Sequence, residues 1–136
     1  MEYTNVMAVA MLTQTIAQNP DHAEAYLQRG QMLLGMGDAM AASKDAEWLL
    51  QHVGESEEVL LLKARTEAAM GQIDAAVATY TKLIKLNPLC VDAFRERGRV
   101  RFSVGNKEGA KADMQKVLEL EPDSLSDVSG NFSTGR

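Results

Sequence analysis

The sequence predicts an all-α protein in which pairs of helices repeat along the chain. Three observations carry this prediction: proline, glycine and alanine each recur in a fixed register, with a period of 34 residues. The aligned columns are Pro20, Pro88 and Pro122, then Gly37, Gly71 and Gly105, then Ala8, Ala42, Ala76 and Ala110. Because no segment alternates apolar and polar residues as a strand would, the repeating unit is helical.

Each 34-residue unit reads as two helices separated by a glycine. Between Ile73 and Ile84 apolar residues recur at three-and-four spacing, which is typical of an amphipathic helix. Gly71 stands where a helix ends in a left-handed residue, and Pro88 stands where the second helix must end. The sequence therefore predicts about seven helices, near 4–18, 23–36, 39–52, 57–70, 73–86, 91–104 and 107–120.

These helices define the expected organisation of the chain. Residues 1–22 would form only the second helix of a repeat. Complete units would follow at 23–56, 57–90 and 91–124, and the Ser/Gly-rich tail at 125–136 is expected to be disordered.

The second unit shows a large apolar residue, a small residue four later, then alanine, tyrosine and proline: Leu60, Ala64, Ala76, Tyr80 and Pro88. The third unit repeats the pattern with Phe94, Gly98, Ala110, Met114 and Pro122. This pattern resembles the tetratricopeptide repeat over residues 23–124, with residues 4–22 as a second helix only. The resemblance implies a right-handed α-solenoid whose first helices line a concave groove, and a non-enzymatic protein–protein interaction module.

Three units depart from the family pattern immediately before the small residue, where the family usually has leucine. Arg29, Lys63 and Arg97 stand there, and Asp45 and Asp113 follow the two arginines by 16 residues. We hypothesise that each arginine forms an ion pair with its aspartate, because the guanidinium fork can meet a carboxylate bidentately. The alternative is a solvated pair of little consequence.

The groove stripe of each first helix holds the candidate binding residues. They are Leu27, Gln31, Leu34, Leu61, Leu62, Arg65, Arg95, Arg99 and Phe102. Arg95 and Arg99 are one helical turn apart, so together they would grip a carboxylate of an acidic or C-terminal peptide. The alternative is an ordinary solvated basic face that Asp92 and Glu96 neutralise.

The two ends of the chain are expected to differ. The last helix carries many charged residues and is expected to form a polar cap, whereas residues 3–20 contain no charged residue. The apolar candidates for self-association, through which the chain would form a homodimer, are Val6, Met7, Val9 and Met11. Alternatively, the chain is a structural segment of a longer solenoid, or the apolar face is simply tolerated.

Neither a catalytic site nor a cofactor or metal site is expected. His22, His52 and Cys90 lack the spacing of metal ligands or of a catalytic pair. The net charge of −5 argues against a nucleic-acid partner, and no apolar run is long enough to span a membrane. Because the N-terminus has no basic segment followed by an apolar one, no secretory signal is expected, and the expected compartment is the cytoplasm.

Overall fold

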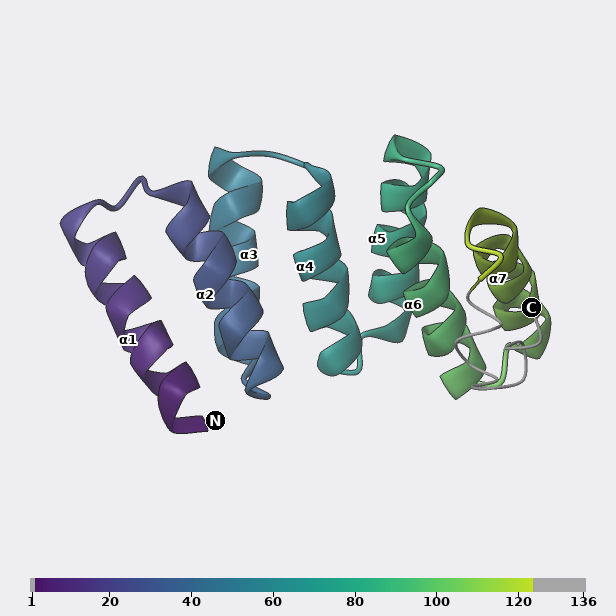
Figure 1. The fold of residues 1–136 in the computed structure, drawn as a ribbon, viewed down its shortest axis with the longest axis horizontal. Helices are drawn as coiled ribbons and strands as arrows, with labels where there is room; N and C mark the ends of the chain where they lie inside the picture. Colours follow the sequence, from purple (N-terminus) through teal and green to yellow (C-terminus); the bar gives the residue numbers. More distant parts are fainter. Residues whose placement is uncertain (1, 124–136) are drawn as a thin grey trace. The chain divides into compact units, whose positions relative to one another are not determined.

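A computed structural model describes residues 2–123, and seven α-helices account for most of this part (Figure 1). Within the described residues there is no β-strand. The helices are α1 (Glu2–Gln18), α2 (Ala23–Gly35), α3 (Ala39–His52), α4 (Glu57–Ala69), α5 (Ile73–Leu86), α6 (Val91–Ser103) and α7 (Lys107–Leu120). The predicted helix boundaries agree with these to within two residues. The predicted disordered tail at 125–136 lies outside the described residues.

The turns between paired helices use the predicted glycines. Gly37, Gly71 and Gly105 all have positive φ, at 91°, 79° and 87°. Other residues rarely adopt this conformation because their Cβ would crowd the backbone. Asp38 and Asn106 precede α3 and α7, the helices that follow two of these turns, and each side chain accepts a hydrogen bond from a backbone N–H of the first turn.

The chain divides into two compact units, and the boundary falls within α5, between Thr79 and Tyr80. It therefore lies inside the predicted repeat 57–90. In the first unit, α2 packs against α1 and α3, and α4 packs against α3 and α2. In the second unit, α6 packs against α7. Each unit buries its own apolar residues, including Leu49 and Leu60 in the first and Leu83 and Val117 in the second.

The small residues of the first helices permit close approach. A Cβ on Gly30 would stand 2.8 Å from Leu62 Cδ2 in α4 and 3.3 Å from Asp45 Cβ in α3. A Cβ on Gly98 would stand 3.1 Å from Asp113 Cβ in α7. These glycines therefore set the distance between neighbouring helices.

Candidate functional site

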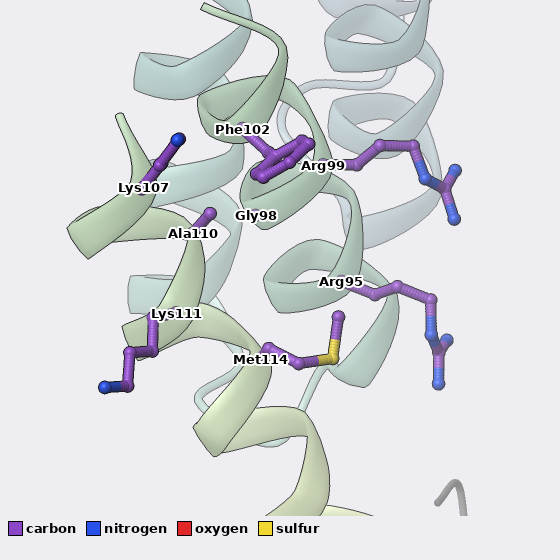
Figure 2. Close-up of a pocket in the computed structure, with 8 residues that line it drawn as sticks. All are labelled: Arg95, Gly98, Arg99, Phe102, Lys107, Ala110, Lys111 and Met114. Atoms are coloured by element: carbon purple, nitrogen blue, oxygen red, sulfur yellow. The ribbon is translucent and has the colours of Figure 1, made fainter. Parts of the chain in front are cut away.

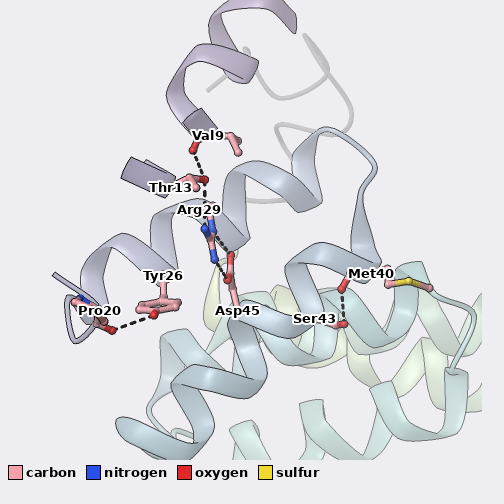
Figure 3. Close-up of polar contacts among 8 residues, drawn as sticks. All are labelled: Val9, Thr13, Pro20, Tyr26, Arg29, Met40, Ser43 and Asp45. Atoms are coloured by element: carbon pink, nitrogen blue, oxygen red, sulfur yellow. Dashed lines mark hydrogen bonds and ion pairs between the residues drawn. The ribbon is translucent and has the colours of Figure 1, made fainter. Parts of the chain in front are cut away.

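An arginine–aspartate pair ties α2 to α3, as the sequence predicts (Figure 3). Arg29 Nε donates to Asp45 Oδ2 at 2.9 Å and Nη2 donates to Oδ1 at 2.6 Å. Arg29 Nη1 also donates to the Thr13 hydroxyl of α1 at 3.3 Å, so one side chain joins three helices. The hydrogen bond to Asp45 raises the pKa of Arg29. Stability from this shift is lost only as the pH rises through that pKa, far above neutral.

The second predicted pair repeats this arrangement between α6 and α7. Arg97 Nε donates to Asp113 Oδ2 at 3.0 Å and Nη2 donates to Oδ1 at 2.7 Å. Arg97 also reaches Thr81 of α5 at 3.0 Å, and Arg101 adds a third donor to Asp113 at 3.1 Å. Both aspartates are buried, 3% exposed for Asp45 and 2% for Asp113. The structure therefore favours buried, hydrogen-bonded pairs over solvated ones.

The middle repeat replaces this pair with a different network. Lys63 contacts Glu67, one turn along α4, and donates to the Thr79 hydroxyl of α5 at 3.3 Å. Thr79 in turn donates to Glu67 Oε1 at 2.7 Å. In this repeat the carboxylate partner of the basic residue therefore lies on the first helix, whereas in the other two repeats it lies on the second helix.

In the first unit, five of the six candidate groove residues line one small cavity of about 250 Å³. They are Gln31, Leu34, Leu61, Leu62 and Arg65, and Gly35 and Glu58 complete the lining. Leu62 is only 2% exposed, because most of its side chain fills the space beside Gly30. Leu27 lies outside this cavity and is half-buried against the apolar cluster of the first unit.

In the second unit, all three candidate residues line one larger cavity of about 440 Å³. We call it the α6–α7 cavity. It is lined by Arg95, Gly98, Arg99 and Phe102 of α6 and by Lys107, Ala110, Lys111 and Met114 of α7. Figure 2 shows the arginines extending on one side and the lysines on the other, with Phe102 and Met114 between them. An apolar surface is therefore flanked by cations, and none of the described residues that line it is acidic.

The four cations of this cavity are not equivalent. Arg95 already donates to Glu121 at 2.9 Å and to Asp92 at 3.3 Å. The predicted joint grip of Arg95 and Arg99 on a carboxylate therefore has a competitor inside the chain. Arg99, Lys107 and Lys111 are exposed and have no hydrogen-bond or ion-pair partner among the described residues. These three are the cations available to an external anion.

Sequence reasoning missed the contribution of α7 to this cavity. The last helix was expected to form a polar cap, yet Met114 is 45% exposed and Phe102 of α6 is 63% exposed. Asp113, a charged residue of this last helix, is buried against Arg97. The available signal was Met114 itself, which occupies the register of the buried residues Ala46 and Tyr80.

The N-terminal candidates for self-association lie on α1. Val6, Met7 and Met11 are exposed, whereas Val9 is half-buried and contributes less surface than predicted. Met11 also lines a cavity of about 480 Å³ between α1 and α2, with Met32 and Gln31. Among residues 2–123, no helix combines the length and apolar character that crossing a membrane requires.

The histidines and the tryptophan have structural roles in the first unit. His22 Nδ1 accepts the Ala25 N–H at the start of α2. Trp48 stacks between Tyr26 and His52, with ring centroids 3.7 Å and 4.1 Å apart. Within the described part of the chain, no group of three histidine, cysteine or acidic side chains is placed to hold a metal ion.

The helix pairs, their glycine turns and their small-residue contacts define an α-solenoid of tetratricopeptide type, as predicted. Residues 61–124 match the family model described as "Tetratricopeptide repeat". The sequence match, which spans slightly less than half of the chain, and the fold together support a tetratricopeptide repeat family. This fold is typical of protein–protein interaction scaffolds, which are usually not enzymes.

Solved structures with the same fold include MamA from Desulfovibrio magneticus, with a TM-score of 0.82 and 18% identity. That match covers 88% of this chain and 68% of the MamA chain. YrrB, described as a tetratricopeptide repeat protein with an unusual peptide-binding site, has a TM-score of 0.81 and 17% identity. That match covers 91% of this chain and 64% of the YrrB chain.

A curated relative is the protein CTR9 homolog of Arabidopsis thaliana, which is 26% identical over 101 residues. The match covers 74% of this chain but only 9% of that protein. The chain therefore spans a small part of this relative.

Proposed function

We propose that this chain is a protein-interaction scaffold that binds an acidic segment of a partner protein, with apolar anchors, at the α6–α7 cavity. The supporting observation is the composition of the cavity: exposed Phe102 and Met114 lie among three cations that have no partner within residues 2–123, and no acid of that range lines the cavity. Apolar burial would supply affinity, and the cations would select acidic segments and accelerate their association.

The geometry favours Arg99 and Lys111 as the main charge contacts. They come from different helices and extend on opposite sides of the apolar surface (Figure 2). Arg95 would contribute less, because binding an external carboxylate there would compete with Glu121. The same reasoning gives Phe102 the role of the central apolar contact.

The test is fluorescence anisotropy with a labelled synthetic peptide composed of glutamate and leucine. We expect the double variant Arg99→Glu with Lys111→Glu to weaken binding about tenfold or more, and we expect added salt to weaken binding to the native chain. The matched control is Lys82→Glu with Lys85→Glu, which makes the same charge change on α5, outside the cavity. Equal affinities for the native and the Arg99/Lys111 chains would contradict the proposal.

A second candidate function is self-association through α1, which the exposed apolar side chains Val6, Met7 and Met11 favour. The test is sedimentation velocity over a range of concentrations. We expect the native chain to dimerise and Met7→Glu with Met11→Glu to be monomeric. Met40→Glu, at an exposed methionine of α3, is the control. A native chain that stays monomeric at high concentration would exclude this function.

A further inference from the structure

The first unit contains its own example of how a helix covers the end of a helix pair. α4 packs against α2 and α3, and Leu62 of α4 fills the space beside Gly30 of α2. Val59 and Leu62, three residues apart on α4, share one buried apolar cluster with Ala46 of α3. One face of α4 therefore fills the depression between α2 and α3.

The α6–α7 pair presents the same positions, and no helix among residues 2–123 covers them. In the 34-residue register, Gly98 corresponds to Gly30 and Met114 corresponds to Ala46. Ala46 is 2% exposed, whereas Met114 is 45% exposed. The α6–α7 cavity is thus the counterpart of the depression that α4 fills in the first unit.

The α4 example also identifies which residues of a covering helix face the two sides of the depression. Glu58, Leu61 and Arg65 share one cavity with Gln31 of α2. Lys63 and Glu67 share another with Ser43 of α3. In the register, Gln31 corresponds to Arg99, and Ser43 corresponds to Lys111.

We infer, on the basis of the proposed function above, that the partner segment is an acidic amphipathic helix that docks on α6–α7 as α4 docks on α2–α3. A leucine-sized side chain lies over Gly98, as Leu62 lies over Gly30. Glutamates on one flank of this helix face Arg99, and glutamates on the other flank face Lys111. The basic side chains at these two positions, where the first unit has Gln31 and Ser43, distinguish this surface from the covered one.

Charge complementarity favours an acidic partner over a second copy of this chain. The exposed apolar helix that another copy would offer is α1, and residues 3–20 carry no acidic side chain to meet Arg99 or Lys111. The α4 helix, which has the required apolar spacing, is already buried in its own unit.

The probe for this inference is a labelled synthetic peptide copying residues 57–70 with Lys63→Glu and Arg65→Glu, which places acids on both flanks of the helix. One control peptide scrambles the same residues, and another carries Leu62→Asp. We expect the native full chain to bind the patterned peptide about tenfold more tightly than either control. We also expect the bound peptide to gain helical circular dichroism.

Two chain variants complete the experiment. Ala110→Leu fills the depression beside Gly98 and is expected to abolish the preference for the patterned peptide, with folding checked by thermal unfolding. The chain with Arg99→Glu and Lys111→Glu is expected to lose its affinity for the acidic peptide. It is expected to bind instead a peptide in which every glutamate is replaced by lysine. This exchange of preference is an independent check, because an unfolded chain would show none.

The possible failures are distinguishable. Equal binding of patterned and scrambled peptides, both lost on charge reversal, would overturn the helical mode and leave the proposed function standing. Binding of no acidic peptide would overturn both. If the peptide-free chain self-associates and Ala110→Leu makes it monomeric, the occupant is a second copy, which also overturns the inference.

Discussion

Arg29 donates to both carboxylate oxygens of Asp45, at 2.9 Å and 2.6 Å, and the aspartate is almost completely buried. Arg97 and Asp113 repeat this geometry at 3.0 Å and 2.7 Å. In each case the pair joins the two helices of one repeat at the point where a glycine lets them approach. The buried carboxylate is tolerated because the guanidinium fork satisfies it.

Removing the arginine of a pair is expected to cost more than removing both partners. Arg29→Ala leaves Asp45 buried without its cation and should lower the free energy of unfolding by about 3 kcal/mol. Arg29→Ala with Asp45→Ala removes the buried charge and should recover a large part of that loss. Urea unfolding measures both. Arg99→Ala, at an exposed arginine with no partner among residues 2–123, is a control that should change stability by less than about 0.5 kcal/mol. Additive losses from the two substitutions would contradict a coupled pair.

The middle repeat should accept the arginine–aspartate pair only as a unit. Thr79→Asp alone places a second carboxylate beside Glu67 and breaks the hydrogen bond between them, so it should cost about 2 kcal/mol. Adding Lys63→Arg supplies the fork and should recover about 1 kcal/mol or more. Equal stabilities of the single and double variants in urea unfolding would show that the middle repeat cannot form an arginine–aspartate pair at these two positions.

Two neighbouring glycines should respond in opposite directions to alanine. Gly37 has φ +91°, so Gly37→Ala should lower stability by about 1 kcal/mol. Gly35 ends α2 without positive φ and with open space around it, so Gly35→Ala should be neutral or stabilise by up to about 1 kcal/mol. Thermal unfolding compares them, and a similar shift for both would mean that backbone conformation is not what requires glycine at 37.

Leucine substitutions at Ala42 and Ala110, which share one register position, should differ in their effect on stability because Ala42 is buried and Ala110 lines a cavity. Ala42 is fully buried, so Ala42→Leu should cost about 1–3 kcal/mol through overpacking. Ala110 lines the open α6–α7 cavity, so Ala110→Leu should change stability by less than about 0.5 kcal/mol. Similar losses of stability for the two variants in urea unfolding would show that the α6–α7 cavity has no room for the larger side chain.

The fold was predictable because it is a repeat. The columns of proline, glycine and alanine located the turns and helix ends, and the structure confirms the seven helices to within two residues. The arginine–aspartate pairs were also predictable, since a fixed separation of 16 residues recurred in two units. Regular spacing predicts these features because equivalent residues make equivalent contacts in each repeat.

The candidate site was predictable only in part. The stripe on α6 gave Arg95, Arg99 and Phe102, which do line one cavity. The contribution of Lys111 and Met114 depends on how α7 lies against α6, which periodicity along one helix does not describe. The burial of Leu62 was not predictable for the same reason, because it depends on how α4 packs against Gly30 of α2.

NMR titration of the full chain with the acidic patterned peptide would show directly whether the α6–α7 cavity binds acidic partner segments. We predict that the backbone amide shifts will concentrate at Arg99, Phe102, Lys111 and Met114, and that the Arg99→Glu with Lys111→Glu chain will show none. Shifts centred instead on the α1–α2 cavity at Met11 and Met32, or equal shifts in both chains, would contradict binding at the α6–α7 cavity.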